Sequence, residues 1–160
     1  MSTQQYTASR LLLKNIVESI ANLAGDDALT MIFNIASHKT AVEMLKLANI
    51  DVKRKIDDPV EAFRVAYNVL RKYLRFDVRD IKEFNHSKIR VEIRDCECIF
   101  SAPELKIMDR VREILKSKKL CVLTLLACSL VEVLSDKVYV IESVECNNGN
   151  ASIVLTSELL

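Results

Sequence analysis

Residues 121–155 read CVLTLLACSLVEVLSDKVYVIESVECNNGNASIVL, and this stretch decides the fold class of the chain. Its first part belongs to an apolar run, Leu120–Leu134, that has the length and spacing of a buried helix. Two runs rich in β-branched residues follow, Lys137–Cys146 and Ala151–Thr156, and the turn Asn147–Asn150 separates them. An Asn-Gly pair between two such runs is the strongest short-range signal of a β-hairpin. The stretch therefore predicts a helix that leads into an antiparallel hairpin.

The first 50 residues have the pattern of helices. Apolar residues recur at helical spacing over Thr7–Leu23, and Gly25 ends that segment in the way a glycine ends many helices. Either of the two aspartates that follow can cap a second helix over Leu29–Ala36. The segment Thr40–Ala48 continues this helix or forms a third one after a break near His38.

The middle of the chain alternates between helix and strand patterns. Asp58 and Pro59 are typical of a helix start, and the apolar spacing predicts a helix through Leu74. Asp77–Glu83 and Lys88–Phe100 alternate as strands do, with a turn between them, and Pro103 begins a further helix. The pattern predicts a single α+β domain over residues 1–160, with helices packed on one face of a small antiparallel sheet of about four strands.

Composition excludes several classes of protein. Half of the 160 residues are hydrophobic and 28% are charged, so the chain is not disordered. The net charge of +1 gives no overall field that would attract nucleic acid or an acidic membrane. No window supplies the roughly 18 apolar residues of a membrane span, and the polar N-terminus lacks a signal peptide, so we expect a cytoplasmic protein. Few Gln and abundant Ile, Val, Lys and Glu give a composition typical of archaeal or other thermophilic proteins.

No motif of an enzyme is present. With two glycines in the chain, neither a phosphate-binding loop nor a dinucleotide fingerprint can form. His38 and His86, the two histidines, do not have the spacing of a zinc-binding or catalytic pair, and we interpret them as surface or structural residues. We therefore predict a protein that is not an enzyme.

The five cysteines allow two interpretations. Cys96 and Cys98 alternate along a predicted strand and share a face, and Cys121 and Cys128 lie two helical turns apart. Together with Cys146 at a strand end, Cys96, Cys98 and Cys121 form a conceivable tetrahedral zinc site. The alternative is that these cysteines are small buried hydrophobic residues.

The C-terminal part of the chain resembles the 4-vinyl reductase domain family, which is related in fold to the TRAPP vesicle-tethering subunits. The residues that carry the resemblance are Cys121, Cys128, Leu130–Leu134, Val138–Glu142, Val144–Cys146 and Gly149. The resemblance implies helices against an antiparallel sheet, a homodimer and a pocket for a small apolar molecule. Sensor proteins of this family hold a zinc ion near the pocket, so the resemblance also implies a zinc site. Cys121 and Cys146 match two of its ligand positions. Ser143 stands where a carboxylate is expected, and residues 151–154 lack the last cysteine.

Two functions follow from these observations. The first is a non-catalytic binding or sensor domain for a small apolar ligand, which acts through an unknown partner protein. Because the ligand would lie between the C-terminal apolar helix and the sheet, we expect Cys121, Leu125, Cys128 and Val131 to line its pocket. Zinc is a possible cofactor of this domain.

The alternative is a homodimeric adaptor or protein-interaction module. A basic set on and after the Asp58–Leu74 helix could contact an acidic partner or nucleic acid, or could be an ordinary solvated face. This set consists of Arg64, Arg71, Lys72, Arg75 and Arg79. A reactive cysteine, Cys121 or Cys128, that accepts an acyl group is a third possibility.

Overall fold

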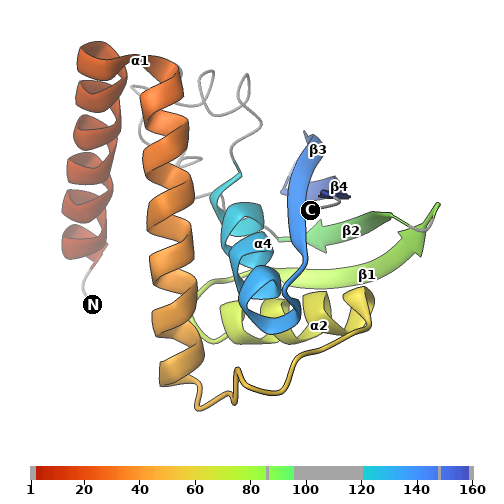
Figure 1. The fold of residues 1–160 in the computed structure, drawn as a ribbon. Helices are drawn as coiled ribbons and strands as arrows, with labels where there is room; N and C mark the ends of the chain where they lie inside the picture. Colours follow the sequence, from red (N-terminus) through yellow and green to blue (C-terminus); the bar gives the residue numbers. More distant parts are fainter. Residues whose placement is uncertain (1–2, 86, 96–120, 148, 159–160) are drawn as a thin grey trace.

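Three helices and a four-stranded antiparallel sheet make up the described part of the chain. The structure is a computed structural model that describes residues 3–85, 87–95, 121–147 and 149–158. In chain order the elements are α1 (Thr3–Leu47), α2 (Pro59–Leu70), β1 (Asp77–Phe84), β2 (Lys88–Arg94), α4 (Val122–Ser135), β3 (Val138–Asn147) and β4 (Asn150–Glu158) (Figure 1). The predicted α+β fold class is confirmed. The predicted helix after Pro103 and the end of the strand predicted to reach Phe100 lie outside the described residues.

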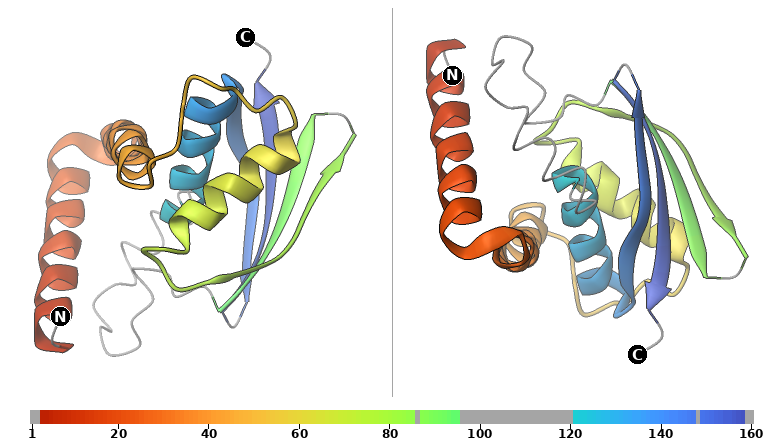
Figure 2. Two further views of the ribbon diagram at one scale, coloured as in Figure 1. Left: turned by 90° about the horizontal axis from the view of Figure 1, so that it is seen from below. Right: turned by 90° about the horizontal axis from the view of Figure 1, so that it is seen from above.

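The long helix α1 consists of two arms that meet at Gly25. Gly25 has φ 80° and ψ 172°, a conformation that almost only glycine adopts. The helix break predicted at this position is therefore confirmed. The second arm runs without interruption to Leu47, so residues 40–47 continue it and do not form a separate helix. In Figures 1 and 2 the second arm lies between the first arm and α4, against which α1 packs.

The start of α2 lies where the sequence predicts it. The Asp58 carboxylate accepts a hydrogen bond from the Val60 N–H at 2.8 Å and a longer one from the Glu61 N–H at 3.4 Å. Pro59 follows at the first helical position, where a backbone N–H has no partner in the helix in any case. These two features fix the first turn of the helix.

The end of α2 differs from the prediction, because the helix stops at Leu70 and does not reach Leu74. The Tyr73 N–H bonds to the Leu70 carbonyl at 3.0 Å, a three-residue spacing that tightens the chain into a turn. The turn leads to Phe76, which is buried in the core. The longer helix was predicted from apolar spacing alone, and that spacing includes Leu74. In the structure Leu74 is half-buried in the turn, where an apolar residue is as well suited as in a helix.

The sheet has the strand order β1-β2-β4-β3, so β1 and β3 form its two edges. β1 and β2 form one hairpin and β3 and β4 form another, as predicted. Asn85 at the first turn and Gly149 at the second both have positive φ, which such turns require. β4 pairs with β2, and this pairing joins the two hairpins into one sheet.

The two faces of the sheet differ sharply in polarity. Ile89, Val91 and Ile93 of β2 are buried on the face that the helices cover, which confirms the predicted alternation (Figure 2). The opposite face is polar: Lys88 lies 2.7 Å from the Glu142 carboxylate, and the Ser152 hydroxyl, on the same face, donates a 2.8 Å hydrogen bond to Glu92. Only one face of the sheet therefore contributes to the core.

Aromatic side chains occupy the centre of that core. Phe63 meets Tyr139 edge to face at a centroid distance of 5.1 Å and stacks on Tyr67 at 6.3 Å. Tyr67 in turn meets Phe76 at 5.9 Å. The cluster connects α2 to β3 and to the turn before β1, and α4 packs beside it against α1, α2 and β3. No helix in the described ranges is both long enough and apolar enough to cross a membrane.

Candidate functional site

The four residues predicted to line an apolar pocket all lie at or on α4. Val131 is completely buried and Cys128 is 8% exposed, and both belong to the hydrophobic core. Cys121 is the N-cap of α4 and, like Leu125, is half-buried. The Thr124 hydroxyl lies in the same helix, is fully buried and has no hydrogen-bond partner among the residues that the structure describes. These side chains pack among α1, α2 and the sheet, and whether they enclose a ligand stays a prediction.

The environment of Cys128 determines its chemistry. Burial, followed by the neighbouring Cys121 and Glu132, raises the pKa of the Cys128 thiol from 9.0 to about 12. A thiol is a nucleophile only as the thiolate, so Cys128 is unsuited to accept an acyl group at neutral pH. Of the two cysteines considered for that role, Cys121 is the more accessible.

The structure describes only part of the predicted zinc site. Cys96 and Cys98 lie outside the described residues. Cys121 begins α4, and Cys146 is in β3 opposite Ala151 of β4. Within residues 3–85, 87–95, 121–147 and 149–158, no group of three or more potential ligands is placed to hold a metal ion. Ser143 and Ala151 offer neither a thiolate nor a carboxylate, so these strands do not fit the ligand pattern of the related sensors.

His38 is a surface residue that faces a partner on another helix. Its Nδ1 atom lies 3.5 Å from a Glu132 carboxylate oxygen, which links α1 to α4, and both side chains are more than 40% exposed. This position agrees with the structural or surface role predicted for His38. His86 lies outside the described residues.

The basic set on α2 is partly neutralised by acidic neighbours. Arg71 donates a 2.9 Å hydrogen bond to Asp77, while Arg64 lies 3.6 Å from Glu61 one turn earlier. Both pairs are exposed, and exposed pairs contribute little to stability. These contacts involve two of the five residues of the set, so binding of nucleic acid or of an acidic partner stays a prediction.

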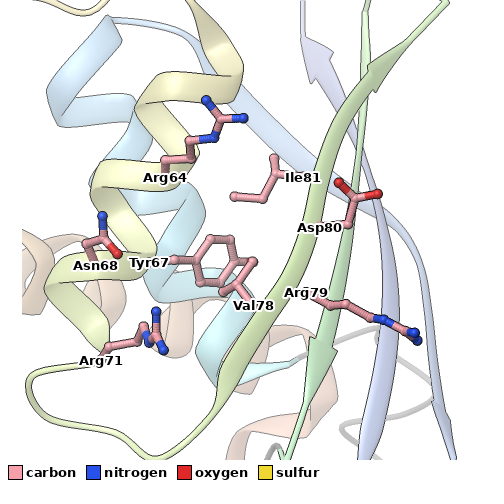
Figure 3. Close-up of a pocket in the computed structure, with 8 residues that line it drawn as sticks. All are labelled: Arg64, Tyr67, Asn68, Arg71, Val78, Arg79, Asp80 and Ile81. Carbon is pink, nitrogen blue, oxygen red and sulfur yellow. The ribbon is translucent and has the colours of Figure 1, made fainter.

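A cavity of about 290 Å³ lies between α2 and β1 (Figure 3). The residues that line it are Arg64, Tyr67, Asn68, Arg71, Val78, Arg79, Asp80 and Ile81. Sequence reasoning missed this cavity. One signal was present: Arg64, Asn68 and Arg71 have the spacing of one helix face, yet nothing in the sequence places β1 beside that face.

Large apolar side chains are exposed on α1. Leu23, next to the break at Gly25, is 88% exposed, and on the second arm Met31, Ile32 and Ile35 are 61%, 41% and 50% exposed. Ile16 on the first arm is 46% exposed. We call these five residues the α1 patch. The second arm, which carries three of them, also buries Ala41, Met44 and Leu45 in the core.

Comparison of the sequence with known protein families finds no match. Comparison with curated proteins finds none either. The resemblance to the 4-vinyl reductase domain family therefore stays a prediction, and the function must be argued from the geometry of this chain alone.

Proposed function

We propose that this protein is a non-catalytic interaction module that pairs with a second copy of itself through the α1 patch. The observation that carries the proposal is the second arm of α1, which is apolar on two sides. One side packs against the domain through residues such as Ala41 and Leu45, and the other presents Met31, Ile32 and Ile35 to solvent. A helix with apolar residues on both sides is normally covered on both sides.

A second copy of the chain fits this surface for two reasons. An aliphatic patch is complementary to itself, which is what a two-fold symmetric interface requires. The net charge of +1 creates almost no long-range repulsion between two copies. Complete burial of one aliphatic side chain gives about 1.5–3 kcal/mol, so covering these partly exposed residues gives roughly 1 kcal/mol each before the cost of association.

An apolar ligand along α4 remains the competing proposal. It receives less support, because Cys128 and Val131 belong to the closely packed core and the cavity that the structure describes lies on another side of α2. The pairing proposed here corresponds to the homodimeric adaptor given as the alternative above, and not to the ligand sensor that acts through a partner protein.

Sedimentation of the full chain over a range of concentrations tests the proposal. We expect a dimer that dissociates on dilution, and we expect the double variant Met31→Glu/Ile35→Glu to be monomeric. Val52→Glu is the matched control, because Val52 is also exposed (38%) but lies in the connector before α2. Circular dichroism verifies that each variant is folded. A wild-type chain that is monomeric at every concentration, or a folded double variant that still dimerises, would overturn the proposal.

A further inference from the structure

The cavity between α2 and β1 has a volume near that of a small ligand site, and charged or polar residues make up most of its lining. Its volume of about 290 Å³ is close to the lower end of the range of ligand pockets, roughly 300 Å³. Tyr67 and Ile81 are buried and Val78 is half-buried, and in Figure 3 these three side chains lie between the helix and the strand. Because Tyr67 is 1% exposed and Ile81 is 9% exposed, only their edges reach the cavity, and together with Val78 they form a small apolar floor that can contact one edge of a ring or of a short aliphatic chain.

Arginines lie at both ends of this floor. In Figure 3 the Arg64 guanidinium is at one end of the α2 wall and Arg71 is at the other, with Tyr67 between them. The two residues are seven positions apart, which is about 10 Å along a helix. In Figure 3 the two guanidinium groups do not converge, so one small head group contacts one arginine and not both.

The two arginines are not equally available. Arg71 is engaged in a 2.9 Å hydrogen bond to Asp77. Arg64 lies 3.6 Å from Glu61, beyond the usual length of a hydrogen bond, and both of these side chains are more than half exposed. The fork of N–H donors on Arg64 is thus the better site for a planar anion, which a guanidinium binds through two parallel hydrogen bonds.

The one acidic residue that lines the cavity does not oppose an anion there. Asp80 is paired with Lys82 at 2.6 Å, and in Figure 3 its carboxylate is directed away from α2. A β-bulge between Val78 and Asp80 makes Arg79 the extra residue of the edge strand. Bulges on edge strands commonly change the direction of side chains next to a site.

From these contacts we infer that the cavity binds a small amphipathic carboxylate. Its apolar body packs on Tyr67, Val78 and Ile81, and its carboxylate forms a bidentate pair with Arg64. The site is formed by α2 and β1 only, so it does not depend on the α1 patch or on pairing of two chains.

Titration of the full chain with benzoate, followed by the backbone amide resonances in NMR spectra, tests this inference. We expect saturable shifts concentrated in residues 64–81. Benzamide, the neutral analogue of the same shape, should bind about tenfold more weakly or worse, because it cannot form the charged pair. Inorganic phosphate should also bind more weakly, because it cannot use the apolar floor. Absence of saturable shifts, or equal affinity for benzoate and either control compound, would overturn the inference.

Variants separate the role of Arg64 from a general effect of charge. Arg64→Gln should weaken benzoate binding about tenfold or more, and Arg64→Lys should weaken it less, since the charge remains but the fork is lost. Arg90→Gln is the matched control, because Arg90 lies over the ring of Phe84 and does not line the cavity, and this variant should change the affinity by less than about threefold. Glu61→Gln should strengthen binding, because it removes the competing carboxylate. A loss in Arg90→Gln as large as that in Arg64→Gln would refute the assignment of the head group to Arg64.

Discussion

The Lys55 ammonium lies 2.8 Å from the Asp136 carboxylate and donates a 2.9 Å hydrogen bond to the Val133 carbonyl, so the connector before α2 is fastened to the C-terminal end of α4. The Ile56 N–H reinforces this attachment with a 2.9 Å hydrogen bond to the Leu134 carbonyl. A cation at this position satisfies carbonyl groups that a helix end leaves without partners, and it interacts favourably with the helix dipole.

Replacement of Lys55 by Met is therefore expected to destabilise the fold. The two charged side chains are 38% and 69% exposed, so solvent weakens the pair and we expect a loss of about 1 kcal/mol in the free energy of unfolding. Urea denaturation measures this loss. Lys53→Met in the same connector is the control and should be nearly neutral. Because salt screens exposed charges, the difference between Lys55→Met and wild type should shrink in about 1 M salt.

Stability should fall as the pH rises above 9. Burial raises the pKa of Cys128 from 9.0 to about 12, so the unfolded chain releases this proton first. Folded stability is then complete below pH 9 and is lost progressively between about pH 9 and 12, at up to about 1.4 kcal/mol per pH unit. Burial, followed by Glu83 and Cys128, also raises the pKa of Tyr139 and gives a change of the same sign at higher pH. Urea denaturation at several pH values should show the decline.

The variants Cys128→Ala and Tyr139→Phe assign this decline to its two sources. Cys128→Ala should flatten the dependence that begins near pH 9, and Tyr139→Phe should flatten the part above pH 10. In addition, Cys128 should resist alkylation in the native protein at pH 8 and react only after unfolding, as peptide mass mapping can show. Rapid alkylation of Cys128 in the folded chain would contradict the environment described here.

Local patterns predicted much of the fold. The hairpin around Asn147–Asn150 and the break at Gly25 follow from residues that favour positive φ, and the strand Lys88–Arg94 follows from alternation of apolar and charged side chains. These signals act over a few residues and do not depend on the rest of the chain. Asp58 and Pro59 likewise determine the start of α2 locally.

Contacts between distant segments could not be predicted in the same way. The pairing of β2 with β4 joins residues 58 to 68 positions apart, such as Ile89 and Leu155, and no local pattern encodes it. The cavity depends on the packing of β1 beside the Arg64 face of α2, which no local pattern encodes either. The exposure of the α1 patch could not be predicted from the sequence either, since an apolar side chain at helical spacing gives the same signal whether the fold covers it or leaves it exposed.

Loss of the Phe63 ring should severely destabilise the domain. Phe63 is completely buried and contacts the rings of Tyr67 and Tyr139. Phe63→Ala removes these contacts and leaves a cavity, so we expect the free energy of unfolding to fall by about 3–5 kcal/mol. Phe84→Ala is the control: Phe84 is half-buried at the end of β1, where Arg90 lies over its ring, and a loss of about 1 kcal/mol or less is expected there. Thermal or urea denaturation distinguishes the two.

The break at Gly25 should be sensitive to any side chain, for a reason that lies in the backbone and not in packing. A Cβ atom at Gly25 would have no heavy atom within 4 Å, yet the φ of 80° with ψ of 172° is unfavourable for alanine by about 1–3 kcal/mol. Alanine strongly favours the helix, so Gly25→Ala should shift α1 toward one continuous helix of about 68 Å.

Small-angle X-ray scattering can detect this change as an increase in the maximum dimension of the particle. The measurement is best made with the Met31→Glu/Ile35→Glu chain, so that pairing of two copies does not contribute. Gly149→Ala is the matched control, because Gly149 also has a positive φ, of 79°, but lies in the turn between β3 and β4. It should lower stability without elongating the particle. If Gly25→Ala leaves both the scattering profile and the stability unchanged, the two arms of α1 are not held apart by the backbone conformation of Gly25.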